Sequence, residues 1–165
     1  GISGYHMRTE KHFSKTCTPS DAFTPIAENT LIRDFLDWCE ETSNEPVDDK
    51  DDYTNIGIAP IVLLAKSGQF FDEGFLHGRM IVHQIPKRDW QKGHSYPREV
   101  DDVICRNPRS SQRSSLANYA YAIGMKKTGT GKEVAEMVKK GEWDDLKDYM
   151  DQDNRINAEL LRRGL

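Results

Sequence analysis

IAPIVLLA, at residues 58–65, is the longest apolar run in the chain. It contains several β-branched residues and is followed by Lys-Ser-Gly, a turn-forming sequence. A short, continuous apolar segment bounded by turn residues is typical of a strand that is buried on both faces. The sequence therefore predicts a central strand of a parallel or mixed sheet at this position. Eight residues are too few to cross a membrane, and we expect no membrane contact.

The composition around this strand is that of a rather polar domain, and we expect residues 1–165 to form one domain. Hydrophobic residues make up 36% and charged residues 30% of the chain, and the net charge is -4. A chain with this charge has no overall basic field, so a nucleic acid would have to be held by a local basic patch. Three cysteines without zinc-site spacing indicate a reducing environment. We therefore expect an intracellular protein, cytoplasmic or nuclear.

The region before the strand is expected to contain one helix between two polar segments. Residues 1–27 are rich in turn formers and show no period, and residues 42–54 carry four aspartates that are typical of a solvated loop. Between them, apolar residues recur at helical spacing and predict an amphipathic helix over residues 30–41, with Asn29 as its N-cap. The apolar positions of this helix are Leu31, Ile32, Phe35, Leu36 and Cys39.

The region after the strand is expected to alternate short elements with loops. Residues 70–80 predict a short helix, residues 81–85 a short strand, residues 86–97 a loop, and residues 100–104 a brief strand or turn. The predicted apolar face of the short helix consists of Phe71, Phe75 and Leu76.

The last third of the chain predicts three helices. They cover residues 115–123, 132–140 and 143–161. Ser114 or Ser115 can cap the first of them, and Gly124 and Gly141 can end the first and the second. A front half with strands and a helical back half predict an α/β or α+β domain.

Two patterns place carboxylates where chemistry can occur. Asp72 follows the buried strand at the start of a helix, where α/β sheets place ligand-binding groups. Tyr149 and Asp153 are four residues apart in the last helix, so both lie on one face. Such a carboxylate can hold a hard cation, and the phenol can position a water molecule. The alternatives are a helix cap for Asp72 and a surface contact for Tyr149 and Asp153.

Two basic segments are candidates for contact with nucleic acid. Lys126 and Lys127 precede a glycine-rich loop at the start of a helix, whose backbone N–H groups could touch phosphates. Arg109 and Arg113 lie in a serine-rich stretch that suits a nucleic-acid backbone. An ordinary connecting loop and a solvated loop are the respective alternatives.

Three stretches resemble the DEDD 3′–5′ exonucleases of the ribonuclease H-like superfamily, in the branch with a tyrosine in the third motif. PIVLLAKSGQFFDEGFLHGR, residues 60–79, is similar to the second motif, in which a buried strand leads through a turn to Phe-Asp and an arginine. SSLANYAYAIG, residues 114–124, is similar to the helix before the third motif. GEWDDLKDYMDQD, residues 141–153, is similar to the third motif itself, Tyr-x-x-x-Asp. With the helix at residues 30–41, the resemblance covers most of residues 28–165.

This resemblance implies an α/β fold, a ribonuclease H-like mixed sheet flanked by helices, and hydrolysis of phosphodiester bonds at 3′ ends. It implies two Mg²⁺ or Mn²⁺ ions, with Asp72 and Asp153 as metal ligands and Tyr149 orienting the nucleophilic water. The implied partner is the 3′ end of a single-stranded DNA or RNA. The candidate nucleic-acid-binding residues are Lys126, Lys127, Arg109 and Arg113.

The chain departs from the family at the first motif, because the sequence contains no Asp-x-Glu. Residues 1–3 resemble the turn after the third strand of the family, which would place the first strands upstream, on a preceding segment or a second chain. An alternative reading takes residues 5–9 as a decayed first strand. The chain would then be a catalytically inactive module of the same fold that binds nucleic acid or a protein partner. A third alternative is an accidental resemblance, with Asp72 and Asp153 far apart.

Overall fold

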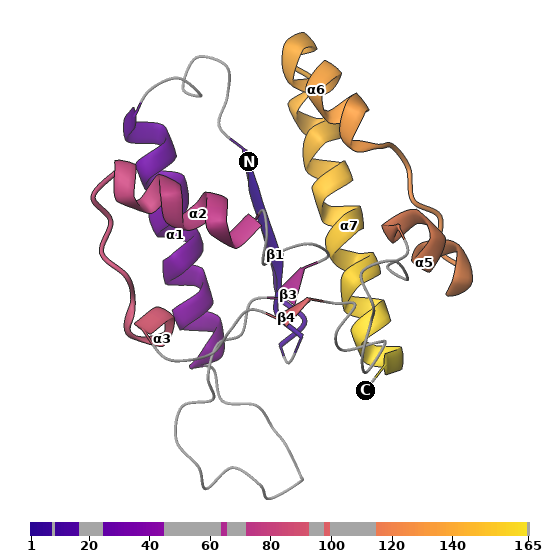
Figure 1. Ribbon diagram of the computed structural model, residues 1–165, viewed down its shortest axis with the longest axis horizontal. Helices are drawn as coiled ribbons and strands as arrows, with labels where there is room; N and C mark the ends of the chain where they lie inside the picture. The colour runs from indigo at the N-terminus through magenta and orange to yellow at the C-terminus, as the bar shows by residue number, and fades with distance from the viewer. Residues whose placement is uncertain are drawn as a thin grey trace, which may run out of the picture.

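The computed structural model describes residues 1–7, 9–16, 25–44, 64–65, 72–92, 98–99 and 115–164. The elements are β1 (Ile2–Tyr5), β2 (His12–Lys15), α1 (Pro25–Ser43), β3 (Leu64–Ala65), α2 (Asp72–Val82), α3 (Asp89–Lys92), β4 (Arg98–Glu99), α5 (Leu116–Ala122), α6 (Gly131–Lys140) and α7 (Trp143–Gly164). Figure 1 shows β1 between two groups of helices, α1 and α2 on one side and α7 on the other. Helices α5 and α6 both pack on α7.

Strands β1 and β2 form an antiparallel hairpin, in which Ile2 lies opposite Lys15 and Tyr5 opposite His12. The turn-rich sequence of residues 1–27 did not indicate these strands, and the turn that the resemblance placed at residues 1–3 is wrong, because β1 begins at Ile2. Each strand has only four residues, too few to give a clear alternation in the sequence. A two-stranded hairpin is at best marginally stable alone, so its stability depends on the helices that cover it.

The two faces of the hairpin contact different helices. On one face, Gly4 and Phe13 approach Trp38 of α1: a Cβ on Gly4 would lie 3.0 Å from Cζ3 of Trp38, and the Phe13 and Trp38 ring centroids are 5.6 Å apart. On the other face, the amide of Asn154 in α7 donates to the hydroxyl of Ser3. The hairpin therefore joins α1 and α7 through the alternation of its side chains.

Helix α1 supplies most of the larger buried cluster, as its pattern predicts. Its five predicted apolar positions are all buried: Leu31, Ile32, Phe35, Leu36 and Cys39. The helix begins at Pro25 rather than at residue 30, because proline suits a first helical turn, where its missing N–H would have had no partner. Asn29 is therefore not the N-cap. It lies inside the helix, where its carbonyl accepts from Arg33 at 2.7 Å.

Helix α2 ends in a local motif and does not lead into the strand predicted over residues 81–85. The N–H of Ile85 donates to the carbonyl of Met80 at 2.9 Å, and the N–H of Gln84 donates to that of Ile81 at 3.1 Å. These two bonds define a Schellman motif, with Gln84 in the left-handed region at φ 52. The β-branched Ile81 and Val82 favoured a strand. The end of α2, however, uses the N–H groups of Gln84 and Ile85, which a strand would need for pairing.

The predicted apolar face of α2 is only partly correct. Leu76 packs against the larger cluster, together with Trp90 of α3. Phe75 is 60% exposed, and Phe71 lies outside the described residues.

Strands β3 and β4 form a short parallel pair, with Leu64 opposite Arg98 and Ala65 opposite Glu99. Strand β3 is the end of the strand predicted over residues 58–65. The remainder of that run and the element predicted over residues 100–104 lie outside the described residues, as does most of the predicted acidic loop.

The three predicted C-terminal helices are present, close to their predicted bounds. Ser115 caps α5 by accepting from the N–H of Asn118 at 3.2 Å. Gly124 and Gly141 follow α5 and α6 with φ 78 and φ 73, which glycine adopts without strain. A second buried cluster joins α5 to α7 around Ile156. None of the described helices is both long and apolar enough to cross a membrane.

We expect Gln84→Gly to raise the free energy of unfolding by about 0.5–1 kcal/mol, because a side chain at φ 52 is strained and glycine is not. Urea denaturation measures the change. The matched control is Gly124→Ala, which places a Cβ in open space but at φ 78. It should lower stability by about 1 kcal/mol. A loss of stability in Gln84→Gly would contradict the assignment of strain.

Candidate functional site

Tyr149 and Asp153 lie on one face of α7, as predicted, and both contact the ammonium group of Lys127. Lys127 Nζ donates to Tyr149 Oη at 3.2 Å and to Asp153 Oδ1. The same Nζ lies 4.3 Å from the centroid of the Tyr149 ring. The Lys127 side chain is only 10% exposed. The predicted pair is therefore a cation site, and its cation is a lysine of the same chain.

The loop that carries Lys127 is held to α7 by a second, independent set of contacts. The side-chain carbonyl of Gln152 accepts from the N–H of Thr128 at 2.6 Å and from its hydroxyl at 2.8 Å. The Gln152 amide donates to the carbonyl of Lys126 at 3.0 Å. Gly129, at φ 83, lies against the Tyr149 ring, where a Cβ would come within 3.1 Å of Cδ2. The glycine-rich loop thus has a defined conformation on α7.

The two lysines predicted to contact nucleic acid differ in orientation. Lys126 is exposed, whereas the ammonium of Lys127 is engaged by Tyr149 and Asp153. Only Lys126 presents its charge to solvent from this loop. The other two candidates, Arg109 and Arg113, lie outside the described residues.

Asp72 is the first residue of α2, and it is exposed. Helix α2 packs on α1, and Figure 1 shows these two helices across β1 from α7. Asp72 and Arg79 are seven residues apart, so they lie on the same face of α2, and Arg79 donates to Glu28 of α1.

The described residues include no group of three or more His, Cys, Asp or Glu side chains that could hold a metal ion. Asp153 and Tyr149 are oxygen donors of the kind that Mg²⁺ and Mn²⁺ accept. A single carboxylate is, however, a weak site without further ligands. The two-metal site with Asp72 and Asp153 stays a prediction.

A second cluster of charged side chains joins the start of α1 to the end of α2. Arg79 donates through Nε to Glu28 Oε1 at 2.6 Å and through a second guanidinium nitrogen to Oε2. His83 Nε2 lies 2.8 Å from the same Oε2, and the His83 side chain is only 6% exposed. The amide of Asn29 donates to the carbonyl of His83 at 3.2 Å. The contacts from Arg79 and His83 satisfy both oxygens of the Glu28 carboxylate.

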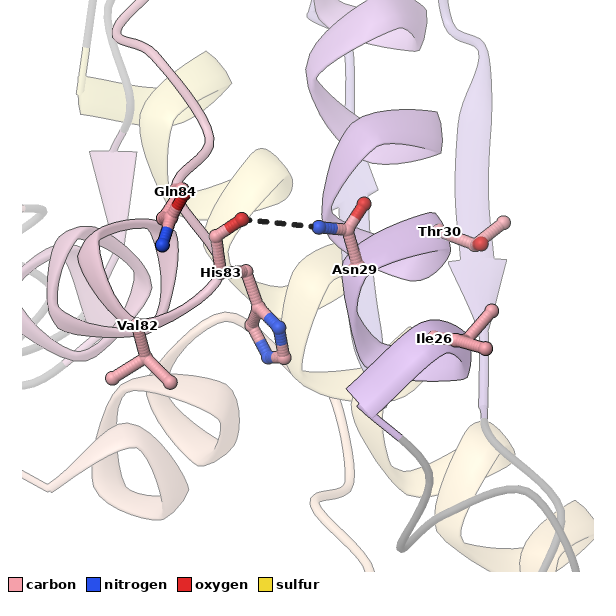
Figure 2. A pocket seen from close by; sticks show the side chains of 6 residues that line it. All are labelled: Ile26, Asn29, Thr30, Val82, His83 and Gln84. Carbon is pink, nitrogen blue, oxygen red and sulfur yellow. Dashed lines mark hydrogen bonds between the residues drawn. The ribbon is translucent and has the colours of Figure 1, made fainter.

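A hollow of about 370 Å³ lies beside this cluster. Figure 2 shows its wall, with Asn29 of α1 facing His83 and Gln84 at the end of α2. The surrounding surface carries exposed apolar side chains, namely Ile26, Ile81 and Val82.

The electrostatics of the cluster are dominated by Arg79. Its hydrogen bond to Glu28 lowers the pKa of that carboxyl from 4.5 to about 2, although partial burial raises it and His83 lowers it further. The carboxylate therefore stays charged, and the cluster functions as a clamp between α1 and α2. Sequence reasoning missed this cluster, although Arg79 and His83 have the four-residue spacing of neighbours on a helix face.

We expect Lys127→Met to lower the free energy of unfolding by about 1–3 kcal/mol, because it leaves a partly buried carboxylate without its cation. Urea denaturation measures the effect. In a double-mutant cycle with Asp153→Asn, the two losses should be non-additive by about 1 kcal/mol. Lys126→Met is the matched control, since this neighbouring lysine is exposed, and should change stability by less than about 0.5 kcal/mol. Additive losses would contradict a direct Lys127–Asp153 pair.

We also expect the bond between Glu28 and Arg79 to make the free energy of unfolding depend on pH in the acidic range. Because the pKa of Glu28 is about 2 in the folded chain and 4.5 in its ordinary state, the stabilisation is complete above pH about 5 and is lost as the pH falls towards 2. The side chain is 28% exposed, so we expect the loss to be about 1–2 kcal/mol.

Denaturation midpoints of Glu28→Gln and wild type, measured between pH 7 and pH 2.5, test this dependence. The variant should be less stable at pH 7 and should approach the wild type at pH 2.5. Glu41→Gln, at an exposed position of the same helix, is the control and should follow the wild type throughout. A constant difference between Glu28→Gln and wild type across this range would exclude the clamp as the cause.

Comparisons of the chain with protein-family models, with curated proteins and with solved structures find no match. The resemblance to the tyrosine branch of the DEDD exonucleases therefore stays a prediction that rests on the three motif stretches.

Proposed function

We propose that the chain is an exonuclease-type domain with a ribonuclease H-like α/β fold, a mixed sheet flanked by helices. In this proposal it acts in the cytoplasm or nucleus and removes nucleotides from the 3′ end of single-stranded DNA or RNA. The observation that supports it is that Tyr149 and Asp153 extend from one face of α7 towards the same point, the Lys127 ammonium. A phenol and a carboxylate therefore lie side by side, as the proposed chemistry requires.

Each residue has a distinct role in this proposal. Asp153, together with Asp72, would hold Mg²⁺ or Mn²⁺, and Tyr149 would orient the attacking water. The metal, when bound, stabilises charge on the attacking and leaving oxygens. An Asp-x-Glu pair would come from a segment or a second chain beyond these residues. Lys126 would contact the strand from the loop next to the site.

The second candidate function is a catalytically inactive module of the same fold, which binds nucleic acid or a protein partner. The specific observation in its favour is the ion pair between Lys127 and Asp153. The ammonium supplies the positive charge that a metal would otherwise bring, and it uses the same carboxylate. A domain stabilised in this way has no need of a metal for its folding.

We expect the chain, together with the segment or second chain that supplies Asp-x-Glu and with Mn²⁺ added, to shorten a 5′-labelled single-stranded oligonucleotide from its 3′ end. Asp153→Asn and Tyr149→Phe should each lower the rate by about a hundredfold, the first by removing the charged ligand and the second by removing only the hydroxyl. Separate DNA and RNA oligonucleotides determine the substrate class. The measurement is the ladder of shortened products on a denaturing gel.

Asp148→Asn is the matched control, because it removes the same charge from an exposed position of α7 next to the pair. Its rate should equal that of the wild type. Equal activity in Asp153→Asn would exclude this site as the catalytic centre. No shortening of either oligonucleotide by the wild type would overturn catalysis by this chain and favour the inactive module.

A further inference from the structure

The second half of α7 carries a basic pocket that neither the motifs nor the proposed function uses. Its volume is about 440 Å³, within the range of ligand-binding pockets. Its charged wall comes from α7 alone and consists of Arg155, Glu159, Arg162 and Arg163. Three guanidinium groups face Glu159 of this wall and Glu10, which pairs with Arg162, so one positive charge is left over, although the chain as a whole carries -4. The pocket is thus a local basic site on an acidic chain.

The rest of the pocket lining is mainly apolar and aromatic. Ile123 and Met125 come from the C-terminal end of α5, and Tyr5 comes from the end of β1. The N–H groups of Gly124 and Met125 are already used by the Schellman bonds to Tyr121 and Ala120. The backbone therefore offers no donors here, and any anion must be held by the arginines.

The three arginine side chains differ in the number of contacts that they make within the protein. Arg162 donates to the hydroxyl of Tyr5 and to Glu10, and its guanidinium carbon lies 5.7 Å from the centroid of the Tyr5 ring. Arg163 donates to Glu159 at 2.7 Å. Within the described part of the chain, the Arg155 side chain forms no hydrogen bond or ion pair, and Arg155 is exposed. Arg155 thus offers a whole guanidinium fork to a ligand, while Arg162 is held in place at the other side.

This arrangement fits a ligand with two different ends. A guanidinium fork matches the oxygens of a phosphate in a bidentate manner. The apolar wall and the Tyr5 ring suit a flat or apolar group attached to that phosphate. Inorganic phosphate would use only the first of these features.

We propose that the pocket between α7, the end of α5 and β1 binds a nucleotide, with its phosphate on Arg155 and its base or sugar against Ile123, Met125 and Tyr5. Such a nucleotide is either free in solution or part of a strand. The proposal does not depend on the exonuclease activity. It requires neither a metal nor Asp153.

Isothermal titration calorimetry, in the presence of a chelator that removes divalent metals, tests the proposal with three probes. They are inorganic phosphate, thymidine 5′-monophosphate and an oligothymidylate of eight residues. We expect at least one of the two nucleotide probes to bind about tenfold more tightly than phosphate, because the apolar wall adds contacts. Arg155→Ala should weaken this binding by about tenfold, and Arg155→Lys by less, since lysine keeps the charge without the fork.

Lys147→Ala is the matched control. It removes one positive charge from an exposed position of α7, two helical turns before Arg155 and outside the pocket. Its affinity should stay within about twofold of the wild type if the pocket, rather than the general charge of the helix, binds the ligand. Because the titration contains no divalent metal and measures binding alone, a failure of catalysis leaves this proposal standing.

The outcomes separate as follows. Tight binding of the monophosphate that Arg155→Ala weakens supports a site for a free nucleotide. Binding of the oligothymidylate alone, weakened in the same way, supports a site for a nucleotide within a strand. Equal affinity for phosphate and both nucleotide probes, equal effects of Arg155→Ala and Lys147→Ala, or no binding of either nucleotide would overturn the proposal.

Discussion

The close approach of β1 to α1 at Gly4 is the constraint on which the rest of the structure depends. A Cβ at this position would lie 3.0 Å from Cζ3 of Trp38 and 3.1 Å from the Phe35 ring. Because the hairpin lies this close, Phe13 can reach the same two rings and become buried. The hairpin then presents its opposite, polar face to α7, where Ser3 accepts from Asn154 and His12 lies 3.7 Å from Asp151. Apolar packing thus holds the hairpin on α1, and polar contacts, one of them the Ser3–Asn154 hydrogen bond, orient α7 on the hairpin.

These polar contacts fix the rotation of α7 about its axis. The rotation in turn determines which side chains of α7 face the Lys127 loop and the basic pocket. With Asp151 and Asn154 turned to the hairpin, Tyr149 and Asp153 face the loop of Lys127. Arg155 and Arg162, seven residues apart on one face, line the basic pocket. One helix therefore serves the hairpin, the cation site and the pocket with different sides of its surface. A substitution that turned α7 would affect all three.

Local patterns were predictable from the sequence, and long-range partners were not. The apolar stripe of α1 and the glycines that end α5 and α6 are set by spacing and by backbone freedom, which a sequence displays directly. Strands of four residues carry too little alternation to be recognised, and the β-branched Ile81 and Val82 belong to a helix whose end motif overrides their preference. The Glu28–Arg79 clamp joins residues 51 positions apart. The Tyr149–Asp153 pair was visible in the sequence, but Lys127 as its cation was not.

Two separate sets of contacts hold the Lys127 loop on α7. Gln152 holds the backbone on both sides of Lys127, through Lys126 and Thr128, without using the Lys127 side chain. The loop can therefore keep its conformation when the ammonium rotates away from Asp153. In the proposed function, a metal on Asp153 would have to displace the Lys127 side chain, while Gln152 would keep the loop backbone in place. The Lys127–Asp153 ion pair would then compete with the metal for the same carboxylate.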